Sequence, residues 1–97
     1  MAGQIRVTPE TMHGRATEFR TAKGNFEQVI QSMSNLITTL QDEWEGEASR
    51  QFAAQFESLR PSFNEMGELI ESIARQCDGV AEATERLDSE MARKFSS

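Results

Sequence analysis

The chain has 97 residues, of which 37% are hydrophobic, and its 10 Lys and Arg against 16 Asp and Glu give a formal net charge of −6. This length suits one domain and leaves no room for a cofactor-binding domain beside a substrate domain. The acidic balance argues against nucleic-acid binding, which needs a dense Lys and Arg surface to neutralise phosphates. We therefore expect a single domain over residues 1–97 that does not bind nucleic acid.

The sequence also argues against a covalent framework and a membrane span. A single cysteine, Cys77, cannot form a disulfide within the chain. No run of apolar residues is long enough to cross a bilayer, and the first residues lack the apolar stretch of a secretory signal. Taken alone, these features predict a protein made in the cytoplasm, which would leave the cell only by a route independent of such a signal.

The first predicted element is an amphipathic helix over about residues 8 to 42. Thr8 suits the N-cap, Pro9 the first helical position, and Glu10 the positive end of a helix. A stop is expected at Gly46, because glycine adopts left-handed backbone angles at little cost. The turn should therefore occupy about residues 43 to 46. Apolar residues occur at every seventh position of this helix: Met12, Phe19, Phe26, Met33 and Leu40.

The second predicted helix covers about residues 47 to 94. Pro61 lies within it, and because the apolar pattern continues past the proline without a slip, we expect a bend there rather than an end. Pairs of opposite charge at helical spacing, among them Glu71 with Arg75, are expected on the solvent face. The positions of this pattern alternate at spacings of four and three, as in a coiled-coil packing face, and all of them except Thr84 are apolar: Phe52, Phe56, Leu59, Phe63, Met66, Ile70, Ile73, Cys77, Val80, Thr84, Leu87 and Met91.

The predicted fold is an all-α, antiparallel helix-turn-helix hairpin, because a break of only a few residues forces the two helices antiparallel. Two such rods cover only one side of each other, so a long apolar seam marks an interaction surface. We therefore expect the hairpin to dimerise into a four-helix bundle. The expected core and dimer seam comprises Phe19, Phe26, Met33, Leu40, Phe52, Phe56, Leu59, Phe63, Met66, Ile70 and Ile73.

The sequence offers little catalytic chemistry. His13 and Cys77 are the only residues of their types and lie far apart in the sequence, whereas metal sites and nucleophilic sites need such residues to converge. We interpret His13 as a solvated surface residue and Cys77 as a packed seam residue. No glycine-rich phosphate loop is present. We expect no enzymatic activity, no catalytic residue, no metal and no cofactor.

Trp44, the only tryptophan, stands at the end of the first helix. It suits either a wedge that locks the turn or a docking contact at the tip of the rod. With two long amphipathic helices and Trp44-Glu45-Gly46 at the central turn, the whole chain resembles the WXG-hundred family. These are the small, early-secreted-antigen-like substrates of type VII secretion in Gram-positive bacteria.

The family also has a secretion motif near the C-terminus, formed by a hydrophobic or aromatic residue, an acidic one four later, and two further hydrophobic ones. The matching positions here are Thr84, Asp88, Met91 and Phe95, where Thr84 lacks the expected bulk. The absence of Tyr from the chain favours the self-pairing branch of the family found in Firmicutes. The alternative is that Leu87, Met91 and Phe95 are only the fraying end of the seam.

The resemblance implies a homodimeric or heterodimeric four-helix bundle, exported folded and without a cleaved signal. Its partners would be a second copy, or a related family member, and the membrane ATPase of the secretion system. A role as adaptor for larger exported effectors is a further possibility. In an antiparallel dimer, Trp44 and Gly46 of one copy would adjoin residues 84 to 95 of the other, and we expect these motifs to form one export signal only after assembly.

Two other functions stay open at this point. One is an intracellular coiled-coil scaffold or chaperone hairpin, which would never be released from the cell. The other is a membrane-active effector, which the net negative charge disfavours, so contact with a membrane is undecided.

Overall fold

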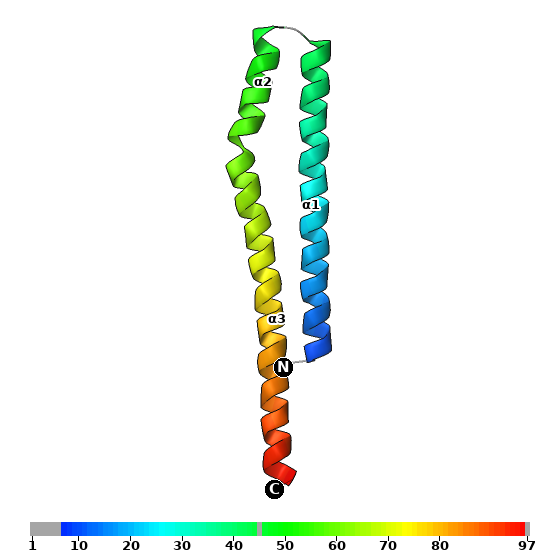
Figure 1. The fold of residues 1–97 in the computed structure, drawn as a ribbon, viewed down its shortest axis with the longest axis vertical. Helices are drawn as coiled ribbons and strands as arrows, with labels where there is room; N and C mark the ends of the chain where they lie inside the picture. Colours follow the sequence, from blue (N-terminus) through cyan, green and yellow to red (C-terminus); the bar gives the residue numbers. More distant parts are fainter. Residues whose placement is uncertain (1–6, 45, 97) are drawn as a thin grey trace, which may run out of the picture.

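The computed structural model describes residues 7–44 and 46–96, which form a helical hairpin (Figure 1). Its elements are α1 (Pro9–Glu43), α2 (Glu47–Ser58) and α3 (Arg60–Ser96), and the described residues include no strand. α2 lies beside the end of α1, and α3 runs antiparallel along the rest of α1 and extends beyond its first turn (Figure 1). The all-α hairpin predicted from the sequence is therefore confirmed.

The hairpin is a rod of 77 × 26 × 17 Å. Its radius of gyration is 21.9 Å, against about 12–13 Å for a compact domain of this length. An elongated hairpin of two arms has no enclosed interior, and each helix keeps most of its surface in water. Side chains that need burial must therefore find it along one narrow strip or on another molecule.

The start of α1 is fixed by reciprocal capping. The Thr8 Oγ1 accepts a hydrogen bond from the Thr11 N–H at 3.1 Å, and the Thr11 Oγ1 accepts one from the Thr8 N–H at 3.2 Å. Pro9 occupies the first helical position, where its missing N–H costs nothing. α1 therefore begins where its capping residues predict.

The second predicted helix is divided at Leu59, where α2 ends and α3 begins. Pro61 has no N–H to donate to the carbonyl four residues earlier, so the helical ladder lacks one bond there. The Leu59 N–H donates to the Phe56 carbonyl at 3.0 Å, and the Phe63 N–H donates to the Leu59 carbonyl at 3.0 Å. The chain continues in the same general direction through this bend (Figure 1).

The two arms of the hairpin meet through small residues as well as large ones. Ala16 of α1 and Ala74 and Ala81 of α3 are fully buried, and their short side chains let the helices approach closely. We use the name contact face for the buried and half-buried rows through which the arms pack. On α1 it comprises Ala16, Lys23, Ile30 and Ile37; on α2 and α3 it comprises Ser49, Ala53, Phe56, Arg60, Phe63, Gly67, Ile70, Ala74, Cys77, Ala81 and Thr84.

The predicted seam divides between the contact face and the outside of the hairpin. Phe56 is buried, whereas Phe63, Ile70, Ile73 and Phe26 are half-buried. The remaining members are exposed: Phe19, Met33, Leu40, Phe52, Leu59 and Met66. Burial within one hairpin thus accounts for only part of the apolar pattern in the sequence.

The exposed members lie together on one side of the rod. Seven residues make almost two helical turns, so every seventh residue recurs on one strip of a helix. On α1 the exposed apolar rows flank the contact face on one side, and the row of His13 and Arg20 flanks it on the other. The apolar side, as we name it, comprises Phe19, Val29, Met33, Leu36, Leu40, Phe52, Leu59, Met66, Leu69, Val80 and Leu87.

Candidate functional site

The turn is built around Trp44, which caps the C-terminus of α1. The backbone N–H of Trp44 donates to the Leu40 carbonyl at 2.8 Å. The centroid of its ring lies 5.7 Å from that of the Phe52 ring in α2. The residue nevertheless remains 41% exposed. Trp44 therefore braces the two arms at the turn and still presents part of its indole at the tip of the rod.

Gly46 supplies the backbone conformation that the turn needs. It precedes α2 with φ +136° and ψ 177°, a region that is accessible to glycine but strained for residues with a side chain. Its carbonyl accepts a hydrogen bond from the Arg50 N–H at 3.3 Å. Together with Gln41, Trp44 and Ser49, these residues line a shallow hollow at the turn. The glycine two residues after the tryptophan is thus a conformational requirement of this hairpin.

We predict that Gly46→Ala lowers the free energy of unfolding by about 1–3 kcal/mol, because the alanine must hold a strained φ. The matched control is Gly24→Ala, in the solvated part of α1, where an added Cβ would meet nothing within 4 Å. That substitution should stabilise the protein by about 0.5–1 kcal/mol, since alanine favours the helix. Urea unfolding followed by circular dichroism measures both changes, and equal effects at both positions would contradict this account of the turn.

The C-terminal motif continues the contact face beyond the point where α1 begins. Thr84 is the last half-buried position, and its hydroxyl donates to the Val80 carbonyl at 2.9 Å. Asp88, Met91 and Phe95 follow at the spacings that the contact face keeps along α3, and they are exposed, Phe95 to 84%. The motif residues therefore occupy a helix face that packs elsewhere in the hairpin and is uncovered here.

The two predicted motifs lie at opposite ends of the rod (Figure 1). Trp44 and Gly46 stand at the turn, whereas Asp88, Met91 and Phe95 belong to the C-terminal part of α3. The end of α3 extends past the start of α1 (Figure 1). One chain therefore does not bring them together, and a site that uses both must include residues from two chains.

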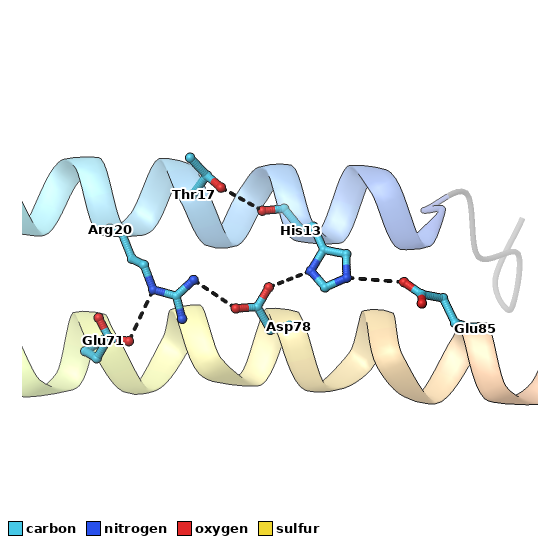
Figure 2. A network of polar contacts seen from close by, with 6 residues as sticks. All are labelled: His13, Thr17, Arg20, Glu71, Asp78 and Glu85. Atoms are coloured by element: carbon cyan, nitrogen blue, oxygen red, sulfur yellow. Dashed lines mark hydrogen bonds and ion pairs between the residues drawn. The ribbon is translucent and has the colours of Figure 1, made fainter.

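A network of charged residues joins α1 to α3 (Figure 2). The helix periodicity places it on the side of the rod opposite the apolar side. The His13 Nδ1 lies 2.7 Å from the Asp78 Oδ1, and the His13 Nε2 lies 3.2 Å from the Glu85 Oε1. Arg20 donates to the other Asp78 oxygen at 2.8 Å and to Glu71 at 3.2 Å. We name this set the polar network; it holds the first half of α1 against α3.

The polar network adds to one sequence-based interpretation and corrects another. The His13 side chain is 44% exposed, in line with the predicted surface position, and it also contacts two carboxylates of α3. Glu71 was expected to pair with Arg75 on its own helix, but it pairs with Arg20 across the hairpin. A signal for this pairing is present in the sequence, because the carboxylates of α3 and the cations of α1 each recur at a spacing of seven.

The carboxylates and cations of this network shift one another's protonation equilibria. The hydrogen bond with Asp78 is the main cause that raises the pKa of His13 above its ordinary value, with Glu85 adding to the effect. The hydrogen bonds from His13 and then Arg20 lower the pKa of Asp78. The Asp78 carboxylate likewise raises the pKa of Arg20, which stays charged throughout the accessible range.

The network is not arranged as a metal centre, and residues 7–44 and 46–96 contain no cluster of three or more His, Cys, Asp or Glu suited to a metal ion. Cys77 is half-buried on the contact face, in line with a packing role. Within the same residues, no helix combines the length and the hydropathy that a membrane crossing demands.

Comparison with known proteins gives matches along almost the whole chain. Residues 4–89 match the model of the family described as proteins of 100 residues with WXG, or WXG100. Protein YukE of Bacillus subtilis is 34% identical over 95 residues, which are 98% of each chain. Type VII secretion system extracellular protein A of Staphylococcus aureus is 23% identical over 91 residues, or 94% of each chain.

Solved structures agree with the hairpin architecture. Geobacillus thermodenitrificans EsxA superimposes with a TM-score of 0.81 at 31% identity, covering 94% of this chain and 100% of that one. The resemblance inferred from the tryptophan and glycine at the turn is thereby confirmed. The chain belongs to the WXG100 family.

Proposed function

We propose that the protein is a substrate of a type VII secretion system and that it is exported as a dimeric four-helix bundle. Membership of the WXG100 family and the similarity to the extracellular protein A of S. aureus support export by this route. The observation that carries the dimer is the apolar side, which runs along both arms and which the hairpin itself leaves in water. A monomer rarely keeps so long an apolar surface exposed.

The proposed partner is a second copy of the chain, packed apolar side against apolar side. Leu36 on α1 is 61% exposed, and Met66 on α3 is 47% exposed, so both arms contribute to the surface. The polar network would stay in water on the outer side of each hairpin, where its charges need no further partner. A related family member with a similar apolar side would satisfy the same requirement.

We propose further that the export signal is shared between the two copies. In an antiparallel dimer, Trp44 and Gly46 of one copy would lie near Asp88, Met91 and Phe95 of the other. The exposed indole and the uncovered end of α3 would then form one surface for the membrane ATPase of the secretion system. An adaptor role for larger exported effectors would use the same surface.

Export from a host with an active type VII system tests this proposal. The double substitution Met91→Ala and Phe95→Ala should reduce the secreted amount at least about tenfold, while unfolding and dimerisation stay as in the wild type, since both side chains are exposed. Ser89→Ala, on a neighbouring exposed position of α3, is the control and should be exported normally. Normal export of the double variant would show that these residues carry no signal.

The rival functions predict different results in the same samples. A scaffold or chaperone would remain in the cells whether or not the end of α3 is altered. A membrane-active effector would release dye from liposomes of anionic or neutral lipid. Export that depends on Met91 and Phe95, without dye release, would favour the secretion substrate over both.

A further inference from the structure

His13 is bracketed by two carboxylates of α3, one on each ring nitrogen (Figure 2). The distances are 2.7 Å from Nδ1 to Asp78 and 3.2 Å from Nε2 to Glu85. An ionised carboxylate can only accept hydrogen bonds, so both contacts are hydrogen bonds only if both nitrogens carry a proton. A neutral imidazole has one N–H and would turn a lone pair toward the other carboxylate. The geometry thus fits the imidazolium ion.

The charges around His13 balance only in that protonated form. Facing it from α3 are the carboxylates of Asp78 and Glu85. Asp78 also receives Arg20 from α1, and Arg20 in turn shares Glu71 with Lys23, whose Nζ lies 4.0 Å from that carboxylate. The network therefore pairs three cations with three carboxylates when the imidazole is charged, and it carries one unmatched negative charge when the imidazole is neutral.

These contacts sit at the open end of the hairpin, where the contact face offers little else. The buried residues nearest to them are Ala16 and Ala81, whose small side chains contribute less apolar burial than a Leu or Phe would. The last turns of α3 continue past the start of α1 (Figure 1). The ionic contacts of His13 therefore add to the packing that holds the first turns of α1 to α3.

We propose that His13 is a proton-operated latch, which fastens the first turns of α1 to α3 when the imidazole is doubly protonated and releases Glu85 when one proton is lost. Stability gained from a group whose pKa is raised on folding is fully present at low pH and is lost as the pH rises through that raised value. The latch accordingly closes in mildly acidic solution and loosens above neutrality. It belongs to the hairpin itself and is independent of the export route.

The protonation of His13 is measured directly by NMR, because the chain has a single histidine. We expect its pKa to lie above the ordinary value of about 6.5. Glu85→Gln should lower this pKa, because the variant removes the carboxylate that faces Nε2. Glu90→Gln removes an equal charge from an exposed position further along α3 and is the matched control. A pKa of His13 that Glu85→Gln leaves unchanged would overturn the proposal.

The opening itself is measured by hydrogen exchange of the first turns of α1 in the wild type and in His13→Gln. The exchange rate of the variant is divided by that of the wild type at each pH, because the intrinsic dependence of amide exchange on pH then largely cancels. The variant should exchange about two- to fivefold faster at about pH 5.5, as expected for a solvent-exposed ion pair, and at nearly the wild-type rate at about pH 8.5.

His13→Lys keeps a positive charge at both values of pH and provides the second control. Its exchange should be slow at both, because an ammonium group retains its protons and can donate to either carboxylate. A rate ratio between His13→Gln and the wild type that does not change with pH would overturn the latch. So would a pH dependence that persists in His13→Lys.

Discussion

Leu36→Glu should convert the dimer into monomers while leaving the hairpin folded. Leu36 is 61% exposed in the single hairpin, so a glutamate there has water around it and costs the monomer little. In the proposed dimer a second copy covers this position, and the substitution removes apolar burial of about 1.5–3 kcal/mol while placing a charge in the interface. A two-fold dimer contains the change twice, so its dissociation constant should rise by at least about 100-fold.

Sedimentation equilibrium over a range of concentrations measures this change. The control is Gln31→Glu, five residues earlier on α1, which adds the same charge to the other side of the helix at an exposed position. It should leave the association intact. A wild-type protein that stays monomeric at micromolar concentrations would remove the basis for the dimer, and a dimeric Leu36→Glu variant would place the interface elsewhere.

The combined export signal can be tested with the same variant. If the signal requires residues from two copies, Leu36→Glu should reduce export although both motifs are intact in each chain. Efficient export of a folded monomer would contradict the shared signal without contradicting export itself, which the substitutions at Met91 and Phe95 test separately.

Phe56→Ala should be the most destabilising truncation within the hairpin. Phe56 is 9% exposed, its ring centroid lies 5.7 Å from that of Phe63, and the Arg60 guanidinium lies 5.4 Å from its ring. Removing it takes away these contacts and leaves a space along the contact face, which costs about 3–5 kcal/mol for a buried Phe. The bend at Leu59 follows directly, so the loss should open the turn end of the rod first.

Phe95→Ala is the matched control, because it makes the same chemical change at a position that is 84% exposed. It should leave the free energy of unfolding nearly unchanged, since little apolar surface is lost from the packed state. Thermal and urea unfolding of the two variants give the comparison. Equal destabilisation by both would mean that the end of α3 is packed in solution.

The sequence is sufficient to predict the hairpin and its turn. Seven-residue spacing of apolar side chains distinguishes helix from strand, and Gly46 marks the only place where the chain must adopt a positive φ among the described residues. The partition of the apolar residues is a different matter. Phe56 and Phe52 belong to the same pattern, yet one is buried and the other exposed, because hydropathy alone does not tell which partner covers a residue.

The contact face cannot be recognised in the hydropathy pattern of the sequence for a further reason. It includes Ala53, Gly67, Ala74 and Ala81, whose small side chains contribute weakly to a hydrophobic pattern although they set how closely the helices approach. Arg60 also interrupts it, and only the structure shows that its guanidinium lies over Phe56 and donates to Ser34.

The pairs of the polar network are not predictable from the sequence, because they depend on the register of α1 against α3. His13 and Arg20 are separated by the same spacing as the acidic residues of α3. The length of the turn and the bend decide which cation meets which carboxylate. The uncovered end of α3 follows from the same register, since it determines how far α3 continues past the first turn of α1.

Placing the apolar residues on one side of the rod, and charges on the other, also limits how far assembly can proceed. Two hairpins that join through identical surfaces use up those surfaces in each other, so the complex is closed and offers no site for a third copy. A rod with apolar strips on both flanks would instead bind a further copy on each side, so the assembly would stay open and grow as its concentration rose. In the proposed dimer, this segregation would keep the protein in discrete pairs as its concentration rises.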